Sequence, residues 1–120
     1  MPGPSKVLLV DDDADWRDAM NDALIELGYQ PTSVATGEAA LDELRREAGA
    51  YAVMLLDLHM PGLSGQEVAD RLPPGAPKVV FLTGAPLSEA GSALRKGGHY
   101  YLPKGAKLEE LSLLLSALAA

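Results

Sequence analysis

The chain has 120 residues, with 10 Lys and Arg against 17 Asp and Glu, which gives a formal net charge of −7. This length suits one domain with a self-supporting core, and the negative charge opposes the phosphate backbone of nucleic acids, which argues against direct nucleic-acid binding. The absence of cysteine excludes disulfides, thiolate metal ligands and a cysteine nucleophile. The negative charge is unevenly placed, because Asp11, Asp12 and Asp13 directly follow an apolar run.

The sequence shows no targeting or membrane-spanning segment. Its start is interrupted by Pro2, Gly3 and Pro4, and so it lacks the apolar region of a signal peptide. The longest uninterrupted apolar stretch, Tyr51 to Leu56, is far shorter than the roughly 20 residues that a membrane-spanning helix needs. We therefore expect a soluble, cytoplasmic protein without membrane contact, in which residues 1–4 form a tail and residues 5–119 form a single domain.

Five short strands are predicted from the apolar runs. Val7 to Val10 is continuous, β-branched at both ends and stops at acidic residues, which is typical of a strand buried on both faces. Similar runs predict strands over residues 52–56 and 79–82, a short last strand over 100–102 and a weaker candidate over 31–35.

Five amphipathic helices are predicted from the spacing of apolar residues. They cover residues 16–27, 39–44, 68–72, 87–96 and 108–118. The first should begin at Asp13 as N-cap and stop at Gly28, and the second should begin at Thr36 as N-cap. Ser64 and Glu67 have the spacing of a capping box at the start of the third.

Strands of this kind alternating with helices predict an α/β fold, a doubly wound five-stranded parallel sheet with helices on both faces. In such a fold the functional site lies beyond the carboxyl ends of the strands. Five polar residues follow strands and are expected to gather there: Asp11, Asp12, Asp57, Thr83 and Lys104.

These five side chains together favour phosphoryl chemistry. Converging carboxylates repel one another unless a cation is present or their pKa values rise, and Mg²⁺ prefers such oxygen ligands. A lysine and a hydroxyl beside a metal ion are suited to bind a phosphoryl group. The pattern therefore predicts phosphoryl transfer onto an Asp nucleophile.

Each residue alone has a simpler interpretation. An acidic run is commonly a solvated loop or a helix start, Asp57 could begin a turn, and Thr83 could cap a helix. Lys104 alone would be interpreted as a surface lysine. Only the joint occurrence of suitable residues at the strand ends favours a site.

Four segments make the chain resemble a known family. They are KVLLVDDD (6–13), MLLDLHMPGLSG (54–65), LTG (82–84) and YLPK (101–104). In this order they are similar to the receiver domain of bacterial two-component response regulators, and the resemblance extends over residues 5–119. It implies a flavodoxin-like strand order 2-1-3-4-5 and a signalling domain that is not an enzyme beyond its own phosphotransfer and dephosphorylation.

The resemblance implies a role for each residue of the site. Asp57 would be the phosphoacceptor, taking the phosphoryl group from a phosphohistidine on a sensor histidine kinase or a histidine phosphotransfer protein. Asp12 would ligate Mg²⁺ (or Mn²⁺) directly and Asp11 through water, with Asp57 and the main-chain carbonyl of His59 as further ligands.

Three residues are implied in the response to phosphorylation. Thr83 would donate its hydroxyl to a phosphoryl oxygen and move inward, and Lys104 would pair with another phosphoryl oxygen. Tyr101 occupies the position of the family's switch aromatic, although it could instead be a plain half-buried strand residue, since Tyr100 beside it must also face somewhere. The output face would comprise the helix over 87–96, the last strand and the closing helix. The same face could also form a homodimer.

The sequence departs from the family pattern after the signature lysine. The family places a proline there, commonly with a cis bond, whereas this chain has Gly105. Either the loop has a trans bond and another shape, or glycine supplies an unusual backbone geometry. The side chains of His59 and Ala85 lie near the acceptor in the family, and a solvent-facing His59 is the simpler expectation; His99 is expected to pack or face solvent.

Two other functions remain open from sequence. One is a docking domain that works without phosphorylation, which Gly105 would motivate. The other is a phosphatase related to the haloacid dehalogenases, but that class needs a second Asp at the position of His59 and a cap insertion that this length does not hold. Whether the domain stands alone or belongs to a larger regulator or hybrid kinase is also open.

Overall fold

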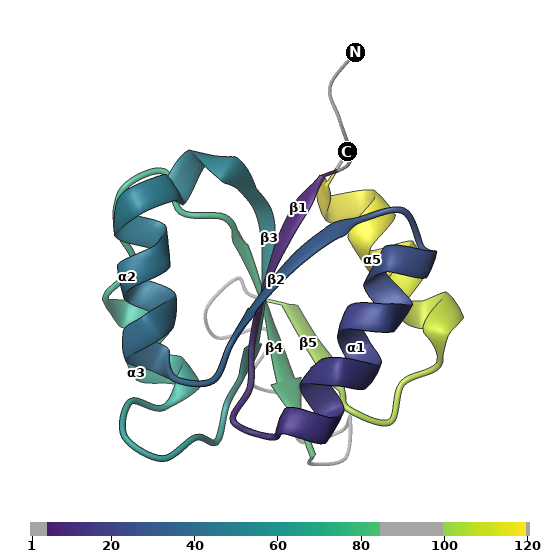
Figure 1. The fold of residues 1–120 in the computed structure, drawn as a ribbon, viewed down its shortest axis with the longest axis horizontal. Coiled ribbons are helices and arrows are strands. Elements are labelled where there is room, and N and C mark those ends of the chain that lie inside the picture. The colour runs from purple at the N-terminus through teal and green to yellow at the C-terminus, as the bar shows by residue number, and fades with distance from the viewer. Residues whose placement is uncertain (1–4, 85–99, 120) are drawn as a thin grey trace.

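The predicted sheet is present, with its predicted strand order. The computed structural model describes residues 5–84 and 100–119. Its strands are β1 (Lys6–Val10), β2 (Gln30–Val34), β3 (Tyr51–Asp57), β4 (Lys78–Thr83) and β5 (Tyr100–Pro103). They form one parallel sheet in the order β2-β1-β3-β4-β5 (Figure 1). This order confirms the doubly wound fold.

Helices cover both faces of the sheet. They are α1 (Ala14–Glu26), α2 (Gly37–Glu47), α3 (Gly65–Asp70) and α5 (Leu108–Ala119), with a short 3-10 turn, η1 (Ala48–Ala50), before β3. Figure 1 shows α2 and α3 on one side of the sheet and α1 and α5 on the other. The helix predicted over 87–96 lies outside the described residues. No helix in the described ranges is long and apolar enough to cross a membrane.

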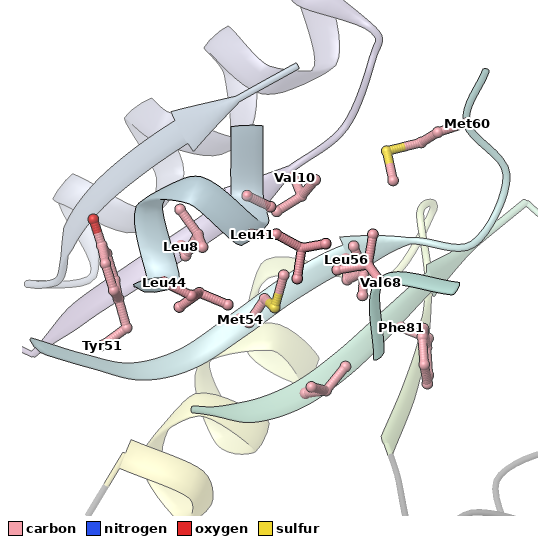
Figure 2. Packing of buried hydrophobic residues seen from close by; sticks show 12 residues of the cluster. Leu8, Val10, Leu41, Leu44, Tyr51, Met54, Leu56, Met60, Val68 and Phe81 are labelled. Atoms are coloured by element: carbon pink, nitrogen blue, oxygen red, sulfur yellow. The ribbon is translucent and has the colours of Figure 1, made fainter. Parts of the chain in front are cut away.

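The continuous apolar strands supply two separate cores. Alternate residues of a strand point to opposite faces, so Leu8 and Val10 pack beneath α2 and α3, whereas Val7 and Leu9 pack beneath α1 and α5. Figure 2 shows the first core, in which Leu41 of α2 lies over the sheet. Burial on both faces explains why these strands show no polar alternation in the sequence.

The helix starts follow the predicted caps. The Asp13 carboxylate accepts hydrogen bonds from the backbone N–H groups of Asp15 and Trp16, at 3.0 and 3.2 Å. The Ser64 hydroxyl accepts from the Glu67 N–H at 3.2 Å, while the Glu67 carboxylate accepts from the Ser64 N–H at 3.1 Å. The predicted N-cap of α1 and the capping box of α3 are therefore confirmed.

Two helices end earlier than their apolar patterns predict. The first ends at Glu26, with Leu27 as C-cap, and Gly28 then adopts a φ of 95°. Glycine takes this left-handed conformation without the steric cost of a Cβ. The third ends at Asp70 rather than at residue 72, because residue 72 precedes a proline and such residues disfavour the helical conformation.

Hydrogen bonds continue the sheet beyond the strand ends. The backbone N–H of Asp11 donates to the Val34 carbonyl at 3.3 Å, and that of Lys104 donates to the Thr83 carbonyl at 2.9 Å. In a parallel sheet all carboxyl ends lie at one edge. The ladder therefore fixes the backbone of the candidate residues at that edge.

Gly65 allows α3 to begin directly against the end of β3. Its N–H donates to the Leu58 carbonyl at 3.0 Å. A Cβ on Gly65 would lie 2.9 Å from the Leu58 Cα and 3.0 Å from the Asp57 carbonyl carbon. These neighbours are backbone atoms that cannot turn aside, so position 65 requires glycine for close approach rather than for conformational freedom.

We expect Gly65→Ala to lower the free energy of unfolding by about 1–3 kcal/mol, because the added methyl group forces the backbone of β3 and α3 apart. Urea denaturation at neutral pH measures this change. Gly49→Ala is the matched control, since a Cβ there meets no atom within 4 Å and should leave stability nearly unchanged. Equal stability of the two variants would contradict the packing argument.

Candidate functional site

Three acidic residues meet at the carboxyl edge of the sheet. Asp11 follows β1 and is 0% exposed, and Asp57 ends β3 and is 4% exposed, whereas Asp12 is exposed. One carboxylate oxygen from each lies within 4.8 Å of those of the other two. The structure thus brings together the three carboxylates that sequence analysis assigned to the site, and leaves Asp13 apart as the cap of α1.

Lys104 places a positive charge between the two buried carboxylates. Its Nζ lies 2.7 Å from Asp11 Oδ2 and 3.3 Å from Asp57 Oδ2. Burial alone would lower the pKa of Lys104, but contact with the two carboxylates outweighs burial and raises that pKa above its ordinary value. The ammonium therefore stays charged at neutral pH.

Gly105 does not displace Lys104 from the site. The described peptide bonds are all trans, and φ at Gly105 lies outside the left-handed region. Of the two alternatives left by the sequence, the trans bond is the one observed. A turn held by the Ala106 N–H, which donates to the Pro103 carbonyl at 3.0 Å, carries Lys104 to the carboxylates.

The surroundings of Asp57 raise the pKa of its carboxyl above the ordinary value. Burial raises the pKa of Asp57, and the negative charge of Asp11 raises that pKa further. The His59 N–H, which donates to Asp57 Oδ1 at 3.1 Å, and the Lys104 ammonium act in the opposite direction, yet the pKa remains above its ordinary value. Asp57 is thus a carboxylate whose charge is only partly compensated by its neighbours.

The uncompensated charge fits a divalent cation. Three carboxylates stand against one ammonium, and Asp11 Oδ2 is buried without a well-directed hydrogen bond among the described residues, although the ammonium lies 2.7 Å away. The other oxygen, Asp11 Oδ1, accepts from the Asp13 N–H at 2.9 Å. Mg²⁺ and Mn²⁺ prefer oxygen ligands of this kind, such as ionised carboxylates.

Thr83 and Tyr101 lie on the two strands that follow β3 in the sheet. Thr83 ends β4 and is 2% exposed. Tyr101 pairs with Phe81 in the register of β4 and β5, and their ring centroids lie 5.1 Å apart. Tyr100 is 43% exposed. The inward-facing aromatic is therefore Tyr101, which settles which of the two tyrosines packs against the core.

His59 contacts the site through its backbone N–H. The residue is exposed, as expected for a solvent-facing loop, and its N–H is the donor to Asp57. Ala85 and His99, which sequence analysis also considered, lie outside the described residues.

Two side chains of α1 that were not predicted from the sequence contact the site. Arg17 Nη1 donates to the main-chain carbonyl of Asp11 at 2.7 Å. The Trp16 ring lies beneath the Lys104 ammonium, with 5.2 Å between Nζ and the ring centroid. Trp16 fits the apolar stripe of α1, so the spacing of apolar residues does not indicate its contact with Lys104. For the Arg17 contact, the nearby acidic run is the only sign in the sequence.

The chain matches the family described as the response regulator receiver domain over residues 7–116. It is 34% identical over 103 residues to the response regulator protein FleR of Pseudomonas aeruginosa, an alignment that covers 83% of this chain and 21% of FleR. It is 33% identical over 116 residues to the transcriptional regulatory protein TctD of Salmonella typhimurium, covering 94% of this chain and 51% of TctD. The chain thus spans about a fifth of the length of FleR and about half of the length of TctD.

A solved structure shares the whole fold. The receiver domain of the sensor histidine kinase PA1611 from Pseudomonas aeruginosa superposes with a TM-score of 0.83 at 27% identity, covering 98% of each chain. That structure holds a magnesium ion coordinated in its active-site cleft. The family match over most of the chain, the strand order and the acidic edge agree. The chain belongs to the response regulator receiver domains, the phosphoacceptor signalling domains of two-component systems.

Proposed function

We propose that Asp57 accepts a phosphoryl group from a phosphohistidine on a sensor histidine kinase or a histidine phosphotransfer protein. The observation that carries this proposal is the position of the Asp57 carboxylate, 3.3 Å from the Lys104 ammonium and within 4.8 Å of carboxylate oxygens of Asp11 and Asp12. Phosphoacceptance is the function of the family, and the assignment to Asp57 is specific to this chain.

In this reaction a carboxylate oxygen of Asp57 forms a bond to phosphorus, and the bond from phosphorus to the histidine nitrogen breaks with its electron pair leaving on nitrogen. Lys104 holds its positive charge beside the oxygen that attacks and can then pair with a phosphoryl oxygen. The His59 N–H orients the carboxylate through the other oxygen, Oδ1.

Receiver domains bind Mg²⁺, and we assign the ion in this chain to Asp11, Asp12, Asp57 and the main-chain carbonyl of His59. Asp12 would ligate it directly and Asp11 through water; Mn²⁺ suits the same oxygen ligands. When bound, the ion neutralises the carboxylates and the charge of about −1.5 to −2 that phosphorylation adds.

The change after phosphorylation would pass through Thr83 and Tyr101. The Thr83 hydroxyl would donate to a phosphoryl oxygen and draw the end of β4 inward. The Tyr101 ring of β5 would follow, because it packs on Phe81, which lies on β4 together with Thr83. This would alter the face formed by β5, α5 and residues 87–96, which is the proposed output surface and a candidate homodimer surface. Residues 87–96 are outside the described ranges.

The position of Lys104 also bears on the two other functions left open by the sequence. Lys104 contacts both buried carboxylates although Gly105 follows it. Gly105 therefore gives no support to a docking domain that works without phosphorylation. A phosphatase related to the haloacid dehalogenases would need a second Asp, as acid and base, two residues after the nucleophile. This chain has the exposed His59 at that position. We therefore favour a signalling domain of residues 5–119 that acts in the cytoplasm on protein partners, without nucleic-acid contact and without turnover of a separate substrate.

We expect incubation with phosphoramidate and Mg²⁺ to add one phosphoryl group to the chain, and Asp57→Asn to abolish this addition, because the amide is not a nucleophile. Intact-protein mass spectrometry measures the adduct. Asp13→Asn is the matched control, since asparagine also caps helices and Asp13 lies outside the cluster. Persistence of the adduct in Asp57→Asn would assign the phosphoryl group elsewhere.

We expect Mg²⁺ to raise the melting temperature of the wild-type chain, because a ligand that binds only the folded state contributes about 2.7 kcal/mol at 100 times its Kd. In Asp12→Asn the midpoint of the Mg²⁺ titration should rise at least tenfold, since a direct carboxylate ligand is lost. Differential scanning fluorimetry follows both. An unchanged midpoint would remove Asp12 from the metal site, and Asp13→Asn serves again as the control.

In the absence of divalent cations, we expect Asp57→Asn to be more stable than the wild-type chain at pH 7, because the buried carboxyl of the wild-type chain is ionised there at a cost to the folded state. A carboxyl with a raised pKa in the folded state destabilises the fold once it ionises, so wild-type stability falls as pH rises from the ordinary value of 3.8 through the raised one. The advantage of the variant should therefore shrink as pH falls toward 3.8. Urea denaturation in EDTA at several pH values measures it, and a wild-type chain more stable than the variant at pH 7 would contradict this sign.

A further inference from the structure

Trp16 is the aromatic neighbour of the Lys104 ammonium. The Nζ lies 5.2 Å from the centroid of the Trp16 ring, within the range of a cation–π interaction. The Lys104 side chain is 27% exposed, so part of it lies against protein rather than in water. The ammonium is thus bounded by two carboxylates and by one indole ring.

The residue after Lys104 offers its side chain no packing surface. The residue that follows is Gly105, and a Cβ placed there meets no atom within 4 Å. A lysine stem is flexible, with four rotatable bonds, and so it loses rotamer freedom when it is held in one position. The position of the ammonium therefore depends on what lies beside the side chain.

A cavity lies on the same side of the sheet as the indole ring. It has a volume of about 190 Å³ and is lined by apolar residues of α1, β5 and α5, together with Trp16 and Lys104. A smaller residue at position 16 would enlarge this space and remove the surface beside the ammonium. Trp16 and Lys104 line this cavity together, so a smaller side chain at position 16 would leave the Lys104 stem more room to turn.

Trp16 is itself fixed to the acidic loop. Its backbone N–H donates to the Asp13 carboxylate at 3.2 Å, and the backbone N–H of Asp13 donates to Asp11 Oδ1 at 2.9 Å. Two hydrogen bonds therefore connect the backbone that carries the indole with the carboxylate that pairs with Lys104.

We propose that Trp16 is a positioning residue that holds the Lys104 ammonium against Asp57 and Asp11 through the face of its indole ring. The proposal rests on the proposed function for its catalytic consequence, since an ammonium held in place can meet the incoming phosphoryl group without reorganisation. The contact itself is independent of that function.

The kinetic test compares Trp16→Leu with Trp16→Phe, which keeps an aromatic face. With phosphoramidate and saturating Mg²⁺, we expect Trp16→Leu to be phosphorylated about fivefold more slowly, Trp16→Phe to recover most of the rate, and the midpoint of Mg²⁺ binding to be unchanged in both. Met20→Leu, which changes another residue of the cavity, is the matched control and should keep the wild-type rate. Equal rates for the Leu and Phe variants would overturn the proposal.

A double-mutant cycle separates positioning from general packing. In the Lys104→Gln background, Trp16→Leu should have no further effect on the rate, because the group that Trp16 positions is already absent. An additive loss would mean that Trp16 acts by another route and would overturn the proposal.

Fluorescence tests the contact without phosphorylation. Trp16 is the only tryptophan of the chain, so its emission reports on this site. We expect Lys104→Gln to change the emission and the exposed Lys107→Gln to leave it unchanged. If the wild-type chain takes no phosphoryl group, the proposed function fails, while the Trp16 emission still tests the contact with Lys104. If Lys104→Gln leaves the emission unchanged, the positioning role of Trp16 is overturned.

Discussion

The site depends on the burial of two carboxylates, Asp11 and Asp57, that share one ammonium. Like charges at this separation and depth destabilise the fold unless cations lie beside them. Lys104 supplies one positive charge and Arg17, which donates to the Asp11 carbonyl, supplies a second, so the three carboxylates still leave the edge of the sheet negative. Such residual charge on oxygen ligands favours a divalent cation.

The parallel sheet makes this crowding possible. Each strand places its following residue at the same edge, and backbone hydrogen bonds from Asp11, Leu58 and Lys104 to neighbouring strands continue the ladder past the strand ends. The residues at the site are therefore held by the sheet itself, and an apolar core packs against each of its faces. Repulsion between the carboxylates acts against a backbone that cannot easily yield.

Much of this was predictable from the sequence because the strands are continuous apolar runs and parallel sheets gather their carboxyl ends. The caps at Asp13 and Ser64 were predictable for the same local reason, since side-chain oxygens at a helix start satisfy free N–H groups. Other features depend on contacts between distant segments. Periodicity places Trp16 among apolar residues and cannot show that its ring meets Lys104, and the choice between Tyr100 and Tyr101 depends on the register of β5 against β4.

The first turn of α1 forms one unit with the acidic loop. Asp13 caps the helix and donates to Asp11, Arg17 donates to the Asp11 carbonyl, and Trp16 contacts Lys104. If this turn frays, all of these contacts are lost together, and the carboxylates lose their arrangement. The start of α1 and the acidic edge should therefore open and close as one cooperative segment, so that ligands at the site also protect the amide groups of this turn from solvent exchange.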